Sequence, residues 1–493
     1  MANRDGFFDN MESQETALTF DDVRLQTGYS ATDFHQSDLR TRFSRNVSLK
    51  IPVVSAAMDR VTEKEMAIAL ASLGGIGVIH RNLPIEEQAR QVRRVKLYIN
   101  GLITRPVCVS ESETVGMVLR MCEDKNYSFR SFPVIDSQGR LVGVLTGNDI
   151  DFCNRAGSVR EAMTNNVITG EPETTPGKAH DLMKEKRIKV LPLANSNLQV
   201  VGLYIWSDLE RIRDGSGRYN TDKNGQLVVA AAVGTGQEAI ERANELAAKK
   251  VDVIVVDSAH GDSKPVMVTL ELIKRENPNV DVVVGNISNY HSAVRLIDAG
   301  ADGIKVGQGG GSICTTRIVA GIGTPQVTAI HNCSKAVRDR KSDIPVCGDG
   351  GIRESGDITI AIGAGADSVM LGMMLAGTNE SPGEVITHRN RPVKSYRGMG
   401  SLGAMQDSAD SRNRYGERQT QKSSIVPEGV SGHVPYVGSL DTTIHRLMEG
   451  LRRGMGYVGV ASIPELQQNA RFYRITNAGI RESHPHDIEV VDN

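Results

Sequence analysis

The residues best suited to covalent chemistry lie in one short segment, 305–317, with the sequence KVGQGGGSICTTR. It carries one cysteine, Cys314, which follows four glycines within positions 307–311 and precedes two threonines and Arg317. Such glycines let the backbone approach a ligand closely and present N–H groups suited to a phosphate. A thiol beside this positive potential is more readily present as the nucleophilic thiolate. The segment predicts a loop-borne nucleophile next to a phosphate ester; the alternative is a flexible turn with an incidental buried cysteine.

The bulk composition narrows the class of protein. A chain of 493 residues exceeds what one core usually serves, so two domains are expected. With 57 basic and 59 acidic residues, the charge balance does not favour a nucleic-acid or acidic-membrane partner. Six cysteines without C-x-x-C spacing argue against zinc and disulfides and for a reducing compartment. With no secretory signal or membrane-length apolar run, a cytoplasmic protein is expected.

Eight short apolar runs recur along the chain, most of them separated by stretches with helical periodicity. Continuous rather than alternating apolar residues suit parallel strands that are buried on both faces. Eight strand–helix units predict an α/β fold, the (β/α)8 or TIM barrel, whose active site lies at the carboxyl ends of the strands. Polar residues follow most of these ends, which favours a function over simple turn formation. The runs are 51–58, 75–80, 227–234, 251–261, 280–286, 303–307, 344–351 and 367–372.

The spacing is broken once, between the second and third runs, where an internal repeat lies. Residues 131–150 align with 190–209, so that a proline, a glycine and an aspartate coincide. The pattern resembles a tandem cystathionine-β-synthase (CBS) pair, a module that often binds purine nucleotides such as ATP or GTP. A purely structural or oligomerising insert explains the repeat equally well, and the sequence leaves open which nucleotide binds and whether it inhibits or activates. The residues of such a site would be Thr146, Asp149, Ser207 and Asp208.

The expected domain organisation follows from this interruption. A first part of the barrel covers 1–96, the tandem CBS domain covers 97–214, and the second part of the barrel covers 215–493. A long polar stretch between glycine-rich anchors also predicts a mobile lid over about 396–430.

From residue 17 to the C-terminus the chain resembles the inosine 5′-monophosphate (IMP) dehydrogenase family. Ten short motifs carry the resemblance, and they stand in the order that this family has. The cysteine segment is specific, whereas each of the others is weak alone. The resemblance implies NAD-dependent oxidation of IMP to xanthosine 5′-monophosphate, a step of guanine nucleotide synthesis, through a covalent Cys314 thioimidate that is then hydrolysed. The motifs are SAAMD, GGIGVIH, DSAHG, GSICTTRIVAGIGTPQ, GDGGIR, AGTNESPGE, SYRGMGSLGAM, RYG, VPEGV and ESHPHD.

The resemblance also implies roles for individual residues. Cys314 is the nucleophile, Arg414 on the lid is the base for hydrolysis with Tyr415 beside it, and Thr316 holds the water. The residues implied to bind IMP are Ser55, Met58, Ser312, Asp349, Gly351, Gly372, Met373, Tyr396, Gly398, Met399, Gly400 and Glu428. Those implied to bind NAD are Asp257, Ser258, Asn286, Gly307 and Gly309.

A potassium ion is the second cofactor that the resemblance implies. Its ligands would come from the cysteine loop and from the C-terminal segment of a neighbouring subunit, so that a cyclic homotetramer is expected. The sequence leaves open whether tetramers stack into octamers. The implied ligands are Gly309, Gly311, Cys314, Glu482, Ser483 and His484.

Three positions depart from the family's usual residues: Gly310 replaces a proline, Met373 a serine and Gly348 an alanine. None of these changes removes a catalytic group. Two alternative functions remain to be distinguished. A GMP reductase, which converts GMP and NADPH to IMP and ammonia, shares the cysteine loop but lacks an Arg–Tyr pair in the lid. A catalytically silent nucleotide sensor is disfavoured because the catalytic residue types are all retained.

Overall fold

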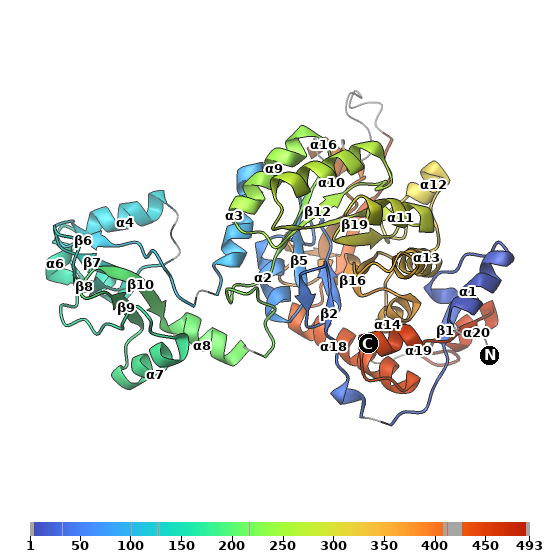
Figure 1. Ribbon diagram of the computed structural model, residues 1–493, viewed down its shortest axis with the longest axis horizontal. Coiled ribbons are helices and arrows are strands. Elements are labelled where there is room, and N and C mark those ends of the chain that lie inside the picture. The colour runs from blue at the N-terminus through green and yellow to red at the C-terminus, as the bar shows by residue number, and fades with distance from the viewer. Residues whose placement is uncertain are drawn as a thin grey trace. The chain divides into compact units, whose positions relative to one another are not determined.

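The computed structural model divides the chain into two units (Figure 1). One unit holds the segment that ends at Lys96, the short segment Arg218–Asp222 and everything from Leu227 onward; the other holds Leu97–Gly217 and Lys223–Gln226. The structure describes residues 4–31, 33–99, 101–125, 127, 129–215, 217–407, 412 and 426–489.

The first unit is a closed barrel of eight parallel strands, in the order β11-β12-β13-β14-β15-β16-β4-β5. Almost every residue of these strands is buried, because helices cover the outside and side chains fill the inside. Each of the eight apolar runs contains one strand to within one residue, so the predicted (β/α)8 fold is confirmed. The strands are β4 (Val53–Ser55), β5 (Ile76–Ile79), β11 (Ala230–Val233), β12 (Val253–Asp257), β13 (Asp281–Ile287), β14 (Gly303–Val306), β15 (Val346–Asp349) and β16 (Ser368–Leu371).

A ring of helices surrounds these strands (Figure 1). The last of them, α18, follows the antiparallel sheet described below and packs against both α14 and α2, which closes the ring. The helices are α2 (Lys64–Ser72), α3 (Ile85–Lys96), α9 (Gln237–Ala248), α10 (Lys264–Glu276), α11 (Tyr290–Asp298), α13 (Gln326–Asp339), α14 (Ser355–Ala364) and α18 (Leu440–Val458).

The second unit contains two halves that share the order helix–strand–strand–helix, and the first half also has a strand, β6, before this pattern and a helix, α6, after it. Each half has its own apolar core, one around Phe132 and one around Leu191. The elements are β6 (Val109–Ser110), α4 (Val115–Asp124), β7 (Phe132–Ile135), β8 (Leu141–Leu145), α5 (Gly147–Phe152), α6 (Val159–Ala162), α7 (Pro176–Lys186), β9 (Val190–Ala194), β10 (Val200–Ile205) and α8 (Trp206–Gly215).

Several elements of the first unit lie outside the barrel itself. An antiparallel sheet follows β16 in the chain and consists of β17 (Val385–His388), β18 (Arg391–Arg397) and β19 (Ser431–Pro435). The remaining elements are α1 (Arg4–Ser13), η1 (Phe20–Asp22), β1 (Val23–Leu25), η2 (Phe34–Gln36), β2 (Thr41–Arg42), β3 (Ser48–Leu49), α12 (Thr316–Ala320), α15 (Met373–Ala376), α16 (Leu402–Asp407), α19 (Ile463–Asn469), β20 (Phe472–Arg474) and α20 (Asn477–Glu482).

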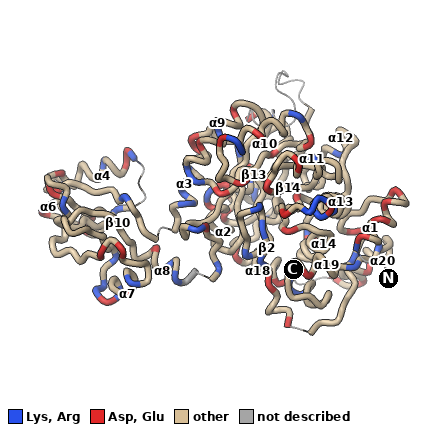
Figure 2. Tube along the Cα trace, in the orientation of Figure 1, with Lys and Arg blue, Asp and Glu red and all other residues tan. Residues whose placement is uncertain are grey.

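Acidic and basic residues are interspersed along both units rather than gathered by sign (Figure 2). Among the described helices, none combines the length and the hydropathy needed to cross a membrane.

Candidate active site

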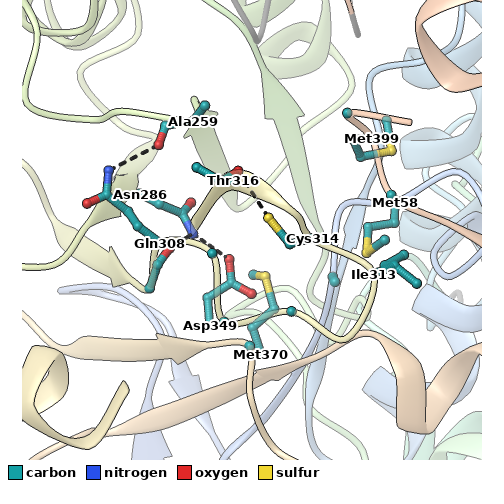
Figure 3. Close-up of a pocket in the computed structure, with 18 of the residues that line it drawn as sticks. Met58, Ala259, Asn286, Gln308, Ile313, Cys314, Thr316, Asp349, Met370 and Met399 are labelled. Atoms are coloured by element: carbon teal, nitrogen blue, oxygen red, sulfur yellow. Dashed lines mark hydrogen bonds between the residues drawn. The ribbon is translucent and has the colours of Figure 1, made fainter. Parts of the chain in front are cut away.

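A cavity lies at the carboxyl ends of the barrel strands, where the polar residues that end β12 and β15 meet the cysteine loop (Figure 3). Its opposite wall comes from the segment after β18 and from Glu428, which precedes β19. Most of the predicted site residues line this cavity. They are Met58, Asp257, Asn286, Gly307, Gly309, Gly311, Cys314, Thr316, Asp349, Tyr396, Gly398, Met399, Gly400 and Glu428.

The cysteine loop depends on glycine at its start. Gly307 and Gly309 have φ angles of 148° and 71°, which L side chains rarely adopt. A Cβ on Gly307 would lie 2.1 Å from the Asp349 carbonyl oxygen, and one on Gly309 would lie 2.5 Å from Arg317 Cγ. The loop therefore folds back tightly over the end of β15, which brings Cys314 into the cavity.

Cys314 is connected to a carboxylate through one hydroxyl group. Its Sγ lies 3.1 Å from Thr316 Oγ1, and Thr316 Oγ1 donates to Glu428 Oε2 at 2.7 Å. Backbone pairing holds this geometry, because the Thr315 N–H donates to the Glu428 carbonyl oxygen at 2.9 Å and the Val430 N–H donates to that of Ile313 at 3.0 Å. The thiol thus has a hydrogen-bonded route to an anionic acceptor.

A buried lysine joins the two acidic residues of the cavity. Lys305 lies in β14 and is 2% exposed, and its Nζ lies 3.0 Å from Asp257 Oδ1 and 2.7 Å from Asp349 Oδ2. It also donates to Asn286 Oδ1, while Asn286 Nδ2 donates to Asp349 Oδ2 at 2.8 Å (Figure 3). Within the described part of the chain, Asp349 Oδ1 has no hydrogen-bond donor, so this oxygen can accept from a ligand hydroxyl.

Tyr396, which lines the cavity, has its hydroxyl group beside Met58 and Gly372. The Tyr396 hydroxyl lies 3.9 Å from Met58 Sδ, and a Cβ on Gly372 would lie 2.8 Å from this hydroxyl. Burial raises the pKa of Tyr396 to about 12, and a hydrogen bond with Ser312 acts in the opposite direction. Tyr396 is therefore a neutral donor near pH 7, the form suited to an anionic ligand. Ser312 and Gly372 contact Tyr396 without lining the cavity.

Four other predicted residues are not among those that line the cavity. Ser55 is fully buried and accepts from Thr62 Oγ1 at 2.8 Å, so its hydroxyl serves packing inside the barrel. Gly351 packs towards Phe20, where a Cβ would lie 3.2 Å from the ring. The other two are Ser258, whose hydroxyl lies 3.3 Å from the His260 carbonyl oxygen, and Met373, the first residue of α15.

Five predicted residues remain, of which the structure describes three. Arg414 and Tyr415 lie outside the described residues. Glu482, Ser483 and His484 are exposed at the end of α20 and line no part of this cavity.

In the second unit, the first pair of predicted nucleotide ligands is engaged in capping a helix. The Thr146 hydroxyl and N–H both donate to Asp149 Oδ2 at 2.7 Å, and the pair forms a capping box at the start of α5. In the other half, Ser207 lies beside Asp208 at the start of α8. Burial raises the pKa of Asp208 to about 6, while Arg211 acts in the opposite direction.

Among the lining residues that sequence reasoning did not select are Lys305, Gln308 and Met370. Two of them left a signal. Lys305 is the one charged residue in the apolar run of β14, and Gln308 is the one residue other than glycine within positions 307–311. Met370 left no such signal. An apolar residue of a barrel strand gives the same sequence pattern whether its side chain faces the core or the ligand.

The comparisons with known proteins agree with this geometry. A family model described as "IMP dehydrogenase / GMP reductase domain" matches residues 17–486. The inosine-5′-monophosphate dehydrogenase of Aquifex aeolicus is 48% identical over 96% of each chain, and that of Halalkalibacterium halodurans is 42% identical over 97% of each chain. A solved structure is also similar: a cysteine-to-alanine variant of GMP reductase from Trypanosoma brucei, in complex with guanosine 5′-monophosphate, has a TM-score of 0.88 and 38% identity, covering 97% of this chain and all of that one. The chain therefore belongs to the IMP dehydrogenase / GMP reductase family.

Proposed function

We infer that this protein oxidises IMP to xanthosine 5′-monophosphate with NAD, the activity for which its curated relatives are named. The observation that carries the mechanism is the position of Cys314, which lies in the cavity on a glycine-rich loop and is hydrogen-bonded through Thr316 to Glu428. A thiolate there is suited to attack the electrophilic C2 carbon of a purine ring.

The sulfur first bonds to C2 of the purine. The C2–H bond then breaks with both electrons leaving as a hydride, for which bound NAD⁺ supplies the acceptor. The product on the protein is a thioimidate joined to Cys314. Water adds to C2 and gives up a proton, the C–S bond breaks, and the thiolate is released with xanthosine 5′-monophosphate.

The hydrogen-bonded chain accounts for the proton that the thiol must lose. Because Thr316 already donates to Glu428, its oxygen can accept the thiol proton while its own proton passes to the carboxylate. Glu428 thereby acts as the base through Thr316, and the same hydroxyl is placed to hold the water of the second step.

We expect Thr316→Val to slow NADH formation in a single turnover by about a hundredfold, because a positioned proton acceptor typically contributes roughly 10²–10⁴. Rapid mixing of the variant with IMP and NAD measures this rate. Thr315→Val is the matched control, since its backbone rather than its hydroxyl contacts Glu428. A Thr316→Val protein with the wild-type single-turnover rate would remove the proton route from the mechanism.

Hydrolysis is assigned to Arg414 with Tyr415, on the sequence motif alone. Arg414→Ala is expected to leave hydride transfer largely intact and to stall release of the product, so that the covalent adduct accumulates. Intact-protein mass spectrometry during turnover measures the adduct. Arg412→Ala is the control from the same segment, because Arg412 donates to the Met405 carbonyl oxygen. Normal steady-state turnover by Arg414→Ala would exclude the arginine as the base.

The residues of the cavity fit both ligands. Asp349 Oδ1 is available for the ribose hydroxyls of IMP, and the purine would lie among Met58, Met370 and Met399. Asp257, at the end of β12, would hold the nicotinamide ribose. A carboxylate is the usual acceptor for a diol.

The potassium assignment is supported by the chemistry of the loop carbonyls. Within the described residues, the carbonyl oxygens of Gly309 and Cys314 accept no hydrogen bond, and that of Gly311 accepts one, from the Cys314 N–H. These oxygens would hold a weakly hydrated cation. Glu482, Ser483 and His484 would complete the site from a neighbouring subunit of a homotetramer.

We also propose that the second unit is a tandem CBS pair that binds regulatory purine nucleotides. Its two halves share the order helix–strand–strand–helix and have separate apolar cores, which supports the proposal. The capping box at Thr146 makes Asp208 the better candidate for a ribose ligand.

GMP reductase is the second candidate, because two similar solved structures carry that name. Two assays separate the activities: NADH formation from IMP with NAD, and NADPH consumption with GMP. We expect the first to proceed and the second to be absent. NADPH oxidation by GMP, without NADH formation from IMP, would reverse the assignment.

A further inference from the structure

A closed ring of hydrogen bonds joins the two ends of the cysteine loop. Arg317, at the end of the loop, donates from Nε to the carbonyl oxygen of Gln308, at its start, at 3.0 Å. Arg317 Nη2 donates to the Thr324 carbonyl oxygen at 2.7 Å. Thr324 Oγ1 donates to Ser288 Oγ at 3.3 Å, and Ser288 Oγ donates to Gln308 Oε1 at 2.6 Å. The ring thus passes through four residues and returns to Gln308, with Cys314 inside the enclosed segment.

The Gln308 side chain extends this ring towards the segment that follows β12. Its Nε2 donates to the Ala259 carbonyl oxygen at 3.2 Å (Figure 3) and lies 3.3 Å from His260 Nδ1. Gln308 and Ser288 are only 9% and 4% exposed, so these bonds compete little with water. Gln308 therefore connects the cysteine loop to the segment that follows β12.

The loop needs such support at its start. Gly309, Gly310 and Gly311 are consecutive, and glycine loses the most conformational freedom on ordering. The second half of the loop is held by its pairing with Glu428 and Val430, but among the described backbone hydrogen bonds none is made by the N–H of Gly309 or Gly310. The ring holds Gln308, the residue immediately before these three glycines.

We propose that Gln308 is a positioning residue, which closes this ring and so keeps Cys314 in its attacking position before substrate binds. The expected effect on NADH formation rests on the proposed function, whereas the closure of the loop does not depend on it. If the loop is closed in only a fraction of the molecules, the rate of attack falls in proportion to that fraction. Gln308→Met keeps the length of the side chain and removes its amide.

We expect Gln308→Met to slow single-turnover NADH formation roughly tenfold, the effect of losing about two hydrogen bonds. In the protein without ligands, alkylation of Cys314 should become faster by a similar factor, measured by mass spectrometry of its peptide with Cys153 as the internal reference. Ser288→Ala removes the hydroxyl that donates to Gln308 and so opens the same ring. It should likewise slow NADH formation and speed up alkylation of Cys314.

Rescue by a proline distinguishes loop closure from general damage. Gly310 does not have a left-handed φ, and a Cβ there would have its nearest neighbour, Gln326 Oε1, at 3.5 Å, so a side chain fits. Proline restricts the open loop and should recover about two- to fivefold of the lost rate in Gln308→Met. In the wild-type protein, where the ring is already closed, Gly310→Pro should change the rate by less than about twofold.

Gln91→Met is the matched control. Gln91 is 3% exposed in α3, where it bonds to Lys64 and Glu63, far from the loop in the chain. It should change neither the alkylation rate nor the single-turnover rate. The proposal is overturned if Gln308→Met and Ser288→Ala leave Cys314 alkylation unchanged, or if Gly310→Pro acts equally in both backgrounds. A wild-type protein that forms no NADH would refute the proposed function instead, while the alkylation experiment would still decide the proposal.

Discussion

Replacing Cys314 by alanine should abolish both NADH formation and the covalent adduct, because the sulfur is the group assigned to bond to the purine. Loss of a catalytic nucleophile in other enzymes costs on the order of 10⁶ in rate, so activity should fall below detection. Binding of IMP should survive, because Asp349 and Tyr396 hold their positions through Lys305, Asn286 and Ser312 rather than through the sulfur.

The two readouts for this variant are separate. Intact-protein mass spectrometry during turnover reports the adduct, and calorimetric titration with IMP reports binding. Cys153→Ala is the control for the loss of a thiol, since Cys153 belongs to the second unit and packs beside its core. An adduct that persists in Cys314→Ala would show that another residue bonds to the purine, which contradicts the mechanism.

The second large effect is expected for Lys305→Met. This change leaves the buried Asp257 and the half-buried Asp349 as neighbouring carboxylates without their shared cation, and breaking a buried ion pair from one side typically costs about 3–5 kcal/mol. The carboxylates would then repel each other and turn away from the ligand hydroxyls. We expect the affinity for IMP to fall by about two orders of magnitude or more, together with a lower midpoint of thermal unfolding.

The chain supplies a matched control for this experiment. Lys96 is also 2% exposed and is also held between two aspartates, at 2.9 Å from Asp222 and 2.8 Å from Asp252. Asp252 precedes β12, at the amino-terminal end of the barrel, where residues contribute to stability rather than to catalysis. Lys96→Met should therefore lower thermal stability to a similar degree while the folded protein binds IMP normally.

Comparison of the two lysine variants decides what Lys305 does. If both variants lose stability and only Lys305→Met loses IMP binding, Lys305 orients Asp257 and Asp349 for ligand binding. Equal IMP affinity in Lys305→Met and wild-type protein would show that the ion pairs serve stability alone. Lys305→Arg retains the charge and should recover part of the affinity.

The barrel was predictable because its signal is local. A strand that is buried on both faces, such as β12 or β16, requires consecutive apolar residues whatever its neighbours are. Eight such runs leave few arrangements other than a closed parallel barrel. The carboxyl end of each strand is also local information, so the order of residues along the chain is enough to assign Asp257, Asn286 and Asp349 to one end of the barrel.

The residue types of the cysteine segment predicted the nucleophile, and the family resemblance implied most of the other residues that line the cavity. The glycines within positions 307–311 predicted a backbone that approaches a ligand closely, and in the structure Gly307, Gly309 and Cys314 all line the cavity. The individual roles of these residues remain predictions for the experiments above. Ser55 shows the limit of a motif, because its hydroxyl is used inside the barrel by Thr62.

What the sequence alone determined is therefore the set of strands, the end of the barrel at which the polar residues gather, and the cysteine that is the candidate nucleophile. Only the tertiary structure decided which polar groups neutralise or hold one another: Lys305 between two aspartates, Thr316 between Cys314 and Glu428, and Gln308 in a ring with Ser288. The physical reason is that burial and periodicity are properties of neighbouring residues, whereas a hydrogen bond between residues 20 or 112 positions apart depends on how the strands and loops close in space.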